Sequence, residues 1–250
     1  MTNKWAKKAR KLWVRILDLF YPRFCAICKT SLNDADGKFV CENCEKKLNI
    51  ISGYYCLKCG SPIGDSFDTN IDRCEYCSTV ELHFERAVAV GRYSDGLREL
   101  ILQMKSYSGQ YLAGYLGNLL ADRLSQQDFI RDGTISAVVP VPIWSGRLLF
   151  IRKYNQAELL AETIASKLGL KYIGSGLIKV KYTPPQTTLD REGRLRNLIG
   201  AFNIKRRGLV ADKKVLLIDD VLTTGTTANE CAKALKRAGA KAVYVGTVGR

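Results

Sequence analysis

The hydrophobic residues of this chain follow two different patterns. From Phe84 onward, short apolar runs alternate with stretches whose apolar residues recur every three or four positions. The apolar runs predict strands at residues 84–93 (FERAVAVGRY), 136–142 (SAVVPVP), Lys214–Asp219 and Ala242–Val248. The periodic stretches predict helices at Gly96–Lys105, Tyr111–Leu124, Gln156–Leu168 before Gly169, and Thr227–Ala238 before Gly239. Strands that alternate with helices predict an α/β fold with a parallel sheet.

The first third of the chain lacks this alternation. Residues 24–79 hold few apolar runs, which predicts a loop-rich module. Residues 4–20 place apolar side chains at helical spacing among lysines and arginines, which predicts a basic amphipathic helix. Its apolar face is expected to dock on the rest of the protein, and weak contact with an anionic membrane surface is the alternative. We therefore expect a helix within 1–22, a small module over 23–82 and an α/β domain over 83–250.

Length and composition agree with a globular protein. The 250 residues are 46% hydrophobic, which is enough to bury a sizeable core. No apolar run reaches the roughly 18–20 residues that cross a bilayer. The first 20 residues lack the apolar core and the cleavage site of a signal peptide. We therefore expect no transmembrane segment and a cytoplasmic location.

The positive charge of the chain is concentrated in its larger part. The net charge is +15, and residues 1–83 account for +3 of it (13 basic against 10 acidic side chains). Residues 84–250 account for the other +12 (26 against 14). Such an excess suits a polyanionic ligand, either a diphosphate or a nucleic acid. A basic surface with no specific partner is the alternative.

Eight of the nine cysteines form four Cys-x-x-Cys pairs, and this spacing is typical of metal ligands. Four thiolates make a closed tetrahedral shell for Zn²⁺, so we expect two structural zinc sites whose metal supplies folding energy. Sequential pairing of the motifs is favoured over cross-bracing, and an iron–sulfur cluster or a redox role is the less favoured chemistry. The predicted ligands are Cys25, Cys28, Cys41, Cys44, Cys56, Cys59, Cys74 and Cys77.

The remaining cysteine and the single histidine are expected to have no metal or catalytic role. Cys231 lies in a predicted helix and is expected to be a small core residue. His83 lies at the junction of the two parts and is expected to be an interface residue.

The segment Lys214–Thr227, KVLLIDDVLTTGTT, carries the clearest chemistry. An apolar strand ends in Asp219 and Asp220, and a run of small and hydroxylated residues then leads into a helix. Ligands of α/β sheets bind at the carboxyl ends of strands, and a helix N-terminus attracts phosphate. Carboxylates accept hydrogen bonds from sugar hydroxyls, so the segment predicts a ribose phosphate site. A strand-end cap followed by an ordinary N-cap is the alternative. The predicted phosphate-binding residues are Thr223, Thr224, Gly225, Thr226 and Thr227.

Three segments resemble those of a known family. KVLLIDDVLTTGTT resembles the phosphoribosyl pyrophosphate loop of type I phosphoribosyltransferases. VVPVPIWSGRLLFIRKYNQAELLA resembles the PVP…R…RGFNQ segment of the ComF family of competence-associated proteins. TPPQTTLDREGRLRNLIGAF resembles the Q…R…N…GAF segment of the same family. The order of these segments behind paired cysteines is also that of ComF proteins.

This resemblance implies a fold, ligands and roles. It implies a type I phosphoribosyltransferase domain behind a zinc-ribbon module, with phosphoribosyl pyrophosphate and Mg²⁺ as ligands. Asp219 and Asp220 become candidate catalytic residues that hold the ribose hydroxyls. Residues 190–197 would belong to a hood over the site. Further substrate-binding residues, most of them for the diphosphate, would be Arg147, Arg152, Lys153 and Arg191.

The sequence departs from the family pattern at a few positions. RGFNQ reads RKYNQ here, with Lys153 for glycine and Tyr154 for phenylalanine. The tyrosine is a mild change, whereas the lysine removes backbone freedom and adds a charge. The stretch before TPPQ carries lysine where the family has arginine.

Two functions remain open from the sequence. The first is transfer of ribose phosphate from its diphosphate to an acceptor, in a ComF-type protein of natural competence or DNA uptake. The second is a non-catalytic module that retains the donor site and handles single-stranded DNA with other competence proteins. Basic residues interleaved with aromatics suit single strands, and the candidates are Tyr54, Tyr55, Phe67, Tyr76, Lys179, Lys181 and Tyr182. Packing within the zinc ribbons and solvated surface charge are the alternative for these residues.

Overall fold

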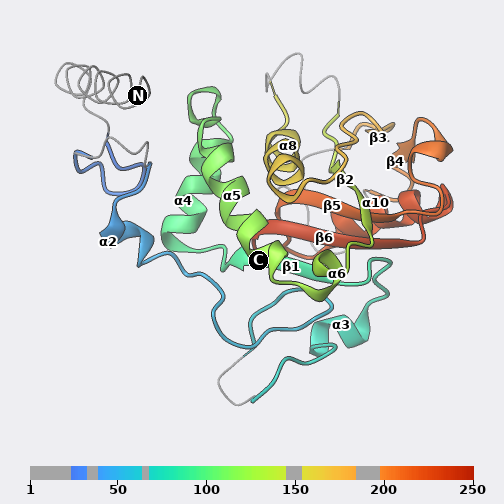
Figure 1. Ribbon diagram of the computed structural model, residues 1–250, viewed down its shortest axis with the longest axis horizontal. Helices are drawn as coiled ribbons and strands as arrows, with labels where there is room; N and C mark the ends of the chain where they lie inside the picture. The colour runs from blue at the N-terminus through green and yellow to red at the C-terminus, as the bar shows by residue number, and fades with distance from the viewer. Residues whose placement is uncertain (1–23, 33–38, 64–67, 145–153, 184–197) are drawn as a thin grey trace, which may run out of the picture.

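A four-stranded parallel sheet forms the centre of the computed structural model (Figure 1). The structure describes residues 24–32, 39–63, 68–144, 154–183 and 198–250. The strand order is β1-β6-β5-β2. The strands of this sheet are β1 (Ala87–Gly91), β2 (Ile135–Pro140), β5 (Lys214–Val221) and β6 (Ala242–Gly249).

β5 lies inside the sheet and pairs in parallel with β2 on one side and β6 on the other. Its residues Val215–Ile218 are all buried, which explains why the strand is apolar on both faces. The register places Ile218 opposite Pro140 of β2 and opposite Gly246 of β6. The carboxyl ends of these strands therefore reach the same edge of the sheet.

Helices cover one face of the sheet, and a helix with a small hairpin covers the other (Figure 1). Leu216 and Ile218 belong to the core beneath α4, α5 and α8, whereas Val215 and Leu217 belong to the core beneath α10. The principal helices are α4 (Asp95–Met104), α5 (Leu112–Ser125), α8 (Gln156–Leu168) and α10 (Thr226–Arg237). The hairpin pairs β3 (Leu177–Lys179) with β4 (Phe202–Ile204) in antiparallel fashion.

Short helices and 3₁₀ turns complete the described structure. Two of the short helices lie in the cysteine-rich region and the others lie in connections of the α/β region. They are α2 (Glu42–Glu45), α3 (Glu75–Thr79), η1 (Tyr107–Gly109), α6 (Asp128–Arg131) and η3 (Arg207–Leu209).

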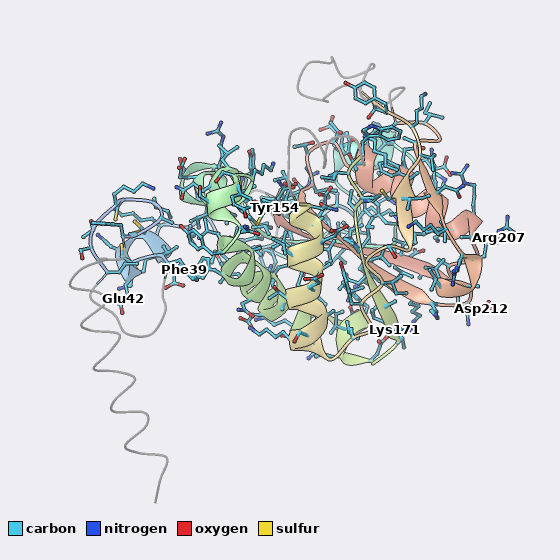
Figure 2. The ribbon with its side chains drawn as sticks, turned by 90° about the horizontal axis from the view of Figure 1, so that it is seen from above. Phe39, Glu42, Tyr154, Lys171, Arg207 and Asp212 are labelled. Atoms are coloured by element: carbon cyan, nitrogen blue, oxygen red, sulfur yellow. The ribbon has the colours of Figure 1, made fainter. Side chains whose placement is uncertain are left out.

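The two halves of the cysteine-rich region lie on different parts of the α/β body (Figure 1). The half that contains α2 contacts α4 and α5, since Gln103 donates a hydrogen bond to the Ala26 carbonyl at 2.6 Å. The half that contains α3 shares the core of the α10 face, because Cys56 and Cys77 pack within it. In the view from above, Glu42 of the first half lies at the opposite end of the molecule from Arg207 (Figure 2).

The structure confirms the predicted parallel α/β fold and most element bounds. The helix Gln156–Leu168 is confirmed at both ends, because the Asn155 side chain accepts from the Ala157 N–H and Gly169 adopts φ 65°. β1 is shorter than the predicted run 84–93. The β3–β4 hairpin was not predicted. The amphipathic helix expected within 1–22 lies outside the described residues.

Two glycines of α5 give a matched test of packing between helices. A Cβ on Gly117 would lie 2.9 Å from Cβ of Thr163 on α8, whereas a Cβ on Gly114 would meet nothing within 4 Å. Gly114→Ala should raise the free energy of unfolding by about 1 kcal/mol through helix propensity. Gly117→Ala should lower it by about 1–2 kcal/mol, because the branched Thr163 side chain cannot yield. Urea denaturation checks both, and equal effects would contradict the packing.

Candidate functional site

The predicted ribose phosphate segment forms the end of β5, the four-residue loop Leu222–Gly225 and the start of α10. We call these four residues the β5–α10 loop. The chain leaves the sheet beside the end of β2, where the Val141 N–H donates to the Ile218 carbonyl at 2.8 Å. This edge, at the carboxyl ends of parallel strands, is where α/β sheets hold their ligands.

The two acidic residues of the segment point to opposite faces of the sheet, as successive strand residues do. Asp220 forms an ion pair with Lys105 at the end of α4, with 3.0 Å between Oδ2 and Nζ. Asp219 lies on the α10 face, where its charge acts on the thiol of Cys231. Its Oδ1 also accepts the Asp220 N–H at 2.9 Å. The pair therefore brackets the end of β5 on both faces.

The environment of Asp219 raises the pKa of its carboxyl. Burial raises the pKa of this carboxyl well above its usual value, and the neighbouring Asp220 charge raises it further. The hydrogen bond from the Asp220 N–H and the more distant Lys105 charge lower the pKa, but by less. Because burial disfavours the charged carboxylate, ionised Asp219 lowers the stability of the folded protein.

The β5–α10 loop presents hydroxyl and N–H donors together. The hydroxyls of Thr224 and Thr226 lie 2.9 Å apart. Gly225 adopts φ 73°, a left-handed conformation that glycine permits, and it serves as N-cap of α10. Within the described residues, the N–H groups of Thr223, Thr224, Gly225 and Thr226 donate to no backbone carbonyl. Thr227 follows in the first turn of α10, so donors converge where phosphate would bind.

Two side chains that the sequence did not predict for this site approach the carbonyl side of the loop. Arg250, directly after β6, donates to the carbonyls of Leu222 at 3.0 Å and Thr223 at 2.6 Å. Tyr76, in α3, donates to the carbonyl of Thr224 at 2.5 Å. Neither position carries a local sequence signal, because both depend on contacts between distant segments.

The segment RKYNQ is described from Tyr154 onward, and its last residues connect α4, β2 and α8. The hydroxyl of Tyr154 lies against the carbonyls of Met104 and Ser106 and donates to the latter at 2.8 Å. The buried Asn155 amide donates to the Val141 carbonyl at 3.0 Å. Tyrosine in place of phenylalanine thus adds a contact beside Lys105.

The eight paired cysteines form two separate tetrads, as the sequential alternative predicts. Within each tetrad all Sγ atoms lie within 4.8 Å of one another, and the nine cysteines of the chain are free thiols. Tetrahedral zinc with Zn–S bonds of about 2.3 Å needs Sγ atoms about 3.8 Å apart. Pairs at 3.7, 3.8 and 3.9 Å meet this need. The first tetrad is Cys25, Cys28, Cys41 and Cys44, and the second is Cys56, Cys59, Cys74 and Cys77.

Both tetrads suit structural Zn²⁺, and their thiols perturb one another. Hydrogen bonds from Thr30 lower the pKa of Cys28 to about 6, whereas burial raises the pKa of Cys44 to about 12. In the second tetrad, a hydrogen bond from Cys56 and the Arg250 guanidinium lower the pKa of Cys59. A bound cation would favour the thiolate form in all four positions of each tetrad.

The cysteine and histidine that were assigned no metal role lie outside both tetrads. Cys231 is fully buried in α10. The His83 N–H donates to Asn229 at 2.6 Å, which places this residue between the cysteine-rich region and α10. Arg147, Arg152, Lys153 and Arg191 lie outside the described residues, as do Phe67 and the whole of the expected hood.

The described aromatic residues proposed for single strands have different environments. Tyr55 is partly buried, and the Arg123 guanidinium lies 5.2 Å from its ring centroid. Tyr54 and Tyr182 are exposed, by 47% and 64%, and Tyr76 contacts the loop. The ring of Tyr182 makes an edge contact with Trp144, with centroids 6.3 Å apart. Among the described candidates, Tyr182 and Tyr54 are therefore the aromatics most open to a base.

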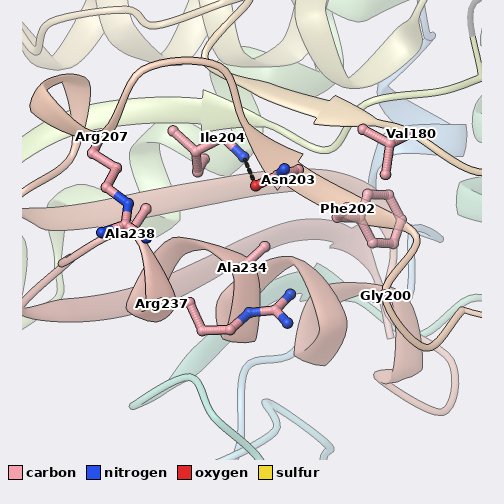
Figure 3. A pocket seen from close by; sticks show the side chains of 9 residues that line it. All are labelled: Val180, Gly200, Phe202, Asn203, Ile204, Arg207, Ala234, Arg237 and Ala238. Atoms are coloured by element: carbon pink, nitrogen blue, oxygen red, sulfur yellow. Dashed lines mark hydrogen bonds between the residues drawn. The ribbon is translucent and has the colours of Figure 1, made fainter.

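A groove separate from the β5–α10 loop lies between α10 and the β3–β4 hairpin (Figure 3). It has a volume of about 340 Å³. Arg207 and Arg237 stand on its rim, and neither makes an ion pair within the described residues. Phe202, Ile204, Ala234 and Ala238 give it an apolar floor. An apolar groove between two free guanidinium groups suits an organic anion.

No helix in the described portion of the chain has both the length and the apolar character required to cross a membrane.

Comparisons with known proteins identify both parts of the chain. A model of the double zinc ribbon domain matches residues 16–80, and a model of the phosphoribosyl transferase domain matches residues 155–248. The α/β body is therefore a type I phosphoribosyltransferase domain, and the cysteine tetrads lie in a zinc-ribbon module.

Three relatives match nearly the whole chain. Competence protein F of Haemophilus influenzae is 29% identical over 235 residues, with 92% of this chain and 98% of that protein covered. DNA utilization protein YhgH of Salmonella typhi is 30% identical over 231 residues, with 91% and 96% covered. Competence protein ComFC of Streptococcus pneumoniae is 26% identical over 209 residues, with 83% and 86% covered. With its zinc ribbons, its phosphoribosyltransferase domain and these relatives, the chain belongs to the ComF family of competence-associated proteins.

Proposed function

We propose that this protein binds phosphoribosyl pyrophosphate at the carboxyl end of β5. The observation that carries the proposal is the arrangement around one strand end of threonine hydroxyls, two carboxylates and N–H groups that donate to no described backbone carbonyl. N–H groups and hydroxyls of Thr223–Thr227 bind the 5-phosphate, while Asp219 and Asp220 accept hydrogen bonds from the ribose hydroxyls. Because Lys105 is ion-paired with Asp220, ligand binding must either break this ion pair or bring Lys105 into contact with the ligand alongside Asp220.

The diphosphate would lie over the end of β2, beside the β5–α10 loop. The hydrogen bond from Val141 to Ile218 holds the ends of β2 and β5 side by side. A ligand bound on the loop would therefore extend to the segment that follows β2. Guanidinium groups match phosphate oxygens in a bidentate manner. Arg147, Arg152, Lys153 and Arg191 are proposed to bind the diphosphate, and Mg²⁺, which prefers carboxylate and phosphate oxygens, is expected to accompany it.

In cells, we infer a role in natural competence or DNA uptake, the processes that the names of the relatives indicate. Thiolate ligands persist in a reducing compartment, which supports a cytoplasmic location. The proposal concerns binding of the donor. Whether ribose phosphate is transferred is decided by release of pyrophosphate in the presence of nucleobases or DNA.

Calorimetric titration of the protein with phosphoribosyl pyrophosphate and Mg²⁺ tests the site. The wild type should bind, and Asp219→Asn or Asp220→Asn should weaken the affinity at least tenfold, because the amide loses charge beside the ribose and the cation. Lys171→Gln, on an exposed residue away from the loop, is the matched control. Unchanged affinity in both aspartate variants would refute the assignment.

Asp219→Asn should also change the stability of the protein. The folded-state pKa of Asp219 is raised, so its ionisation costs stability at pH values above its unfolded-state pKa. The amide keeps an acceptor for the Asp220 N–H and carries no charge. The variant should therefore have a higher Tm than wild type at pH 7 and the same Tm at pH 3. A lower Tm at pH 7 would show that the charge is stabilised in the fold.

We further propose that each tetrad holds one Zn²⁺. Metal analysis of the purified protein should give two zinc ions per chain, and Cys28→Ser or Cys74→Ser should remove one each. Ser31→Ala, which removes a hydroxyl near the first tetrad, is the control and should retain both. Iron or labile sulfide in the wild type would instead indicate clusters.

A second candidate function is single-strand binding at the groove between α10 and the hairpin. The observation that favours it is the pair of arginines on the rim, which make no ion pair in the described part of the chain, with exposed Tyr182 beyond β3. A basic rim tracks the phosphates while an aromatic side chain stacks on a base.

Affinity for an oligothymidylate, measured against salt concentration, tests the groove. Arg207→Gln plus Arg237→Gln should weaken binding and reduce the steepness of the salt dependence by about two counterions. Lys46→Gln plus Lys47→Gln removes the same charge from the first zinc ribbon and is the control. Equal losses of affinity in the two double variants would show that the effect comes from overall charge and not from the groove. Absence of binding by wild type at low salt would eliminate this function.

A further inference from the structure

The β5–α10 loop is held on one side by Tyr76 of the second zinc ribbon and by Arg250, which itself bonds that ribbon. Three consecutive carbonyls, those of Leu222, Thr223 and Thr224, accept hydrogen bonds from Arg250 or Tyr76. α3, which contains Tyr76, lies within the second tetrad region, between Cys74 and Val80. The loop therefore meets the ribbon with its acceptors.

Planar peptide geometry gives this contact a consequence. In a trans peptide, the carbonyl of one residue and the N–H of the next point in opposite directions. Bonds to the carbonyls of Leu222, Thr223 and Thr224 therefore turn the N–H groups of Thr223, Thr224 and Gly225 away from the ribbon. These are three of the four loop N–H groups that donate to no backbone carbonyl among the described residues. The bonds on one side of the loop thus orient its phosphate donors on the other.

Arg250 connects this loop directly to the second tetrad. Its Nε donates to the Cys59 carbonyl at 2.9 Å, and its Nη2 lies 3.3 Å from the Cys59 Sγ. Its backbone is fixed independently, since its N–H donates to Gly91 and its carbonyl accepts from Tyr93. A guanidinium group is rigid and planar, so a displacement of the nitrogens that contact Cys59 also displaces the nitrogen that bonds the loop carbonyls.

A second contact ties α10 to the same ribbon. The Asn229 side chain accepts the His83 N–H at 2.6 Å and donates to the Glu81 carbonyl at 2.9 Å. The start of the loop is therefore connected to the second ribbon through Arg250. The helix that follows the loop is connected through Asn229 to residues that come directly after the ribbon. The first tetrad makes its contacts with α4 and α5, as the bond from Gln103 to Ala26 illustrates.

We propose that Arg250 is a positioning residue for the 5-phosphate and that it makes phosphate binding depend on zinc in the second tetrad. A zinc-bound Cys59 stays a thiolate and offers the guanidinium a charge-assisted hydrogen bond. With this bond in place, Arg250 holds the carbonyls of Leu222 and Thr223. Tyr76 supports the next carbonyl from the same ribbon. This inference rests on the proposed function of the loop.

Binding of ribose 5-phosphate and of inorganic pyrophosphate, measured separately on the full chain, tests the positioning role. Arg250→Met keeps the apolar stem and removes every donor, and it should weaken ribose 5-phosphate binding at least tenfold. Pyrophosphate affinity should stay within twofold, because the loop is assigned to the other phosphate. Arg250→Lys should recover part of the loss. Arg86→Met, which breaks an exposed ion pair with Asp128, is the matched control.

The outcomes separate this inference from the proposed function. If wild type binds neither ribose 5-phosphate nor phosphoribosyl pyrophosphate, the proposed function fails and this inference fails with it. If wild type binds and Arg250→Met binds equally well, only this inference is refuted. Equal losses for ribose 5-phosphate and pyrophosphate would also refute it, as a general loss of structure. Should Arg250→Met not fold, Tyr76→Phe decides, with a loss of several-fold expected.

A double-mutant cycle tests the dependence on zinc. Cys74→Ser alters the second tetrad without removing the sulfur that Arg250 contacts, because Arg250 bonds Cys59 and the Sγ of Cys74 lies 3.8 Å from that of Cys59. It should remove one zinc ion and weaken ribose 5-phosphate binding, while circular dichroism shows the α/β helices retained. In the Arg250→Met background, the same change should have little further effect, because the connection is already cut. Additive losses in the double variant would refute transmission through Arg250.

Discussion

The parallel pairing of β5 with β2 and β6 determines where every other part of the site can lie. Two ladders of hydrogen bonds hold the strand, and its residues up to Ile218 are buried on both faces. The chain can therefore turn polar only beyond Ile218, where Asp219 and Asp220 follow. Side chains alternate along a strand, so one acid meets α4 and the other meets α10. The residues at one strand end are therefore in contact with helices on both faces of the sheet.

The two zinc ribbons, though similar in sequence, relate differently to this strand end. The first contacts α4 and α5 and contributes to the core on that face. The second is continuous with the core beneath α10, and its side chains reach the β5–α10 loop. One copy of the duplicated motif therefore lies beside α4 and α5, and the other lies against the β5–α10 loop. The same set of packing contacts therefore stabilises the second ribbon and determines the geometry of the loop.

Most of the fold could be predicted from the sequence because its elements carry strong local signals. The helix Gln156–Leu168 has a polar N-cap, a periodic apolar face and a glycine after its last turn, and all three act within a few residues. The buried strands β5 and β6 are long apolar runs. The β3–β4 hairpin escaped prediction because strands of three residues show no measurable periodicity.

The site was predictable only where it is local. Asp219, Asp220 and the threonine run are adjacent in the chain, so their chemistry can be seen in one segment. Lys105 and Arg250 enter through contacts with residues far away in sequence, and no local pattern marks a lysine at a helix end or an arginine after a strand as a partner. Tyr76 was considered as a base-stacking residue, whereas its hydroxyl bonds the loop.

The support of the β5–α10 loop also bears on how the protein folds. Tyr76 and Thr224 are 148 positions apart, and Arg250 and Cys59 are 191 positions apart. β1 pairs in parallel with β6, the last strand of the sheet. Contacts of such separation form late, because closing long segments of chain costs entropy that local contacts do not recover. During synthesis the ribbons emerge before β6, so the β5–α10 loop gains its final shape only after the strands beneath it have formed.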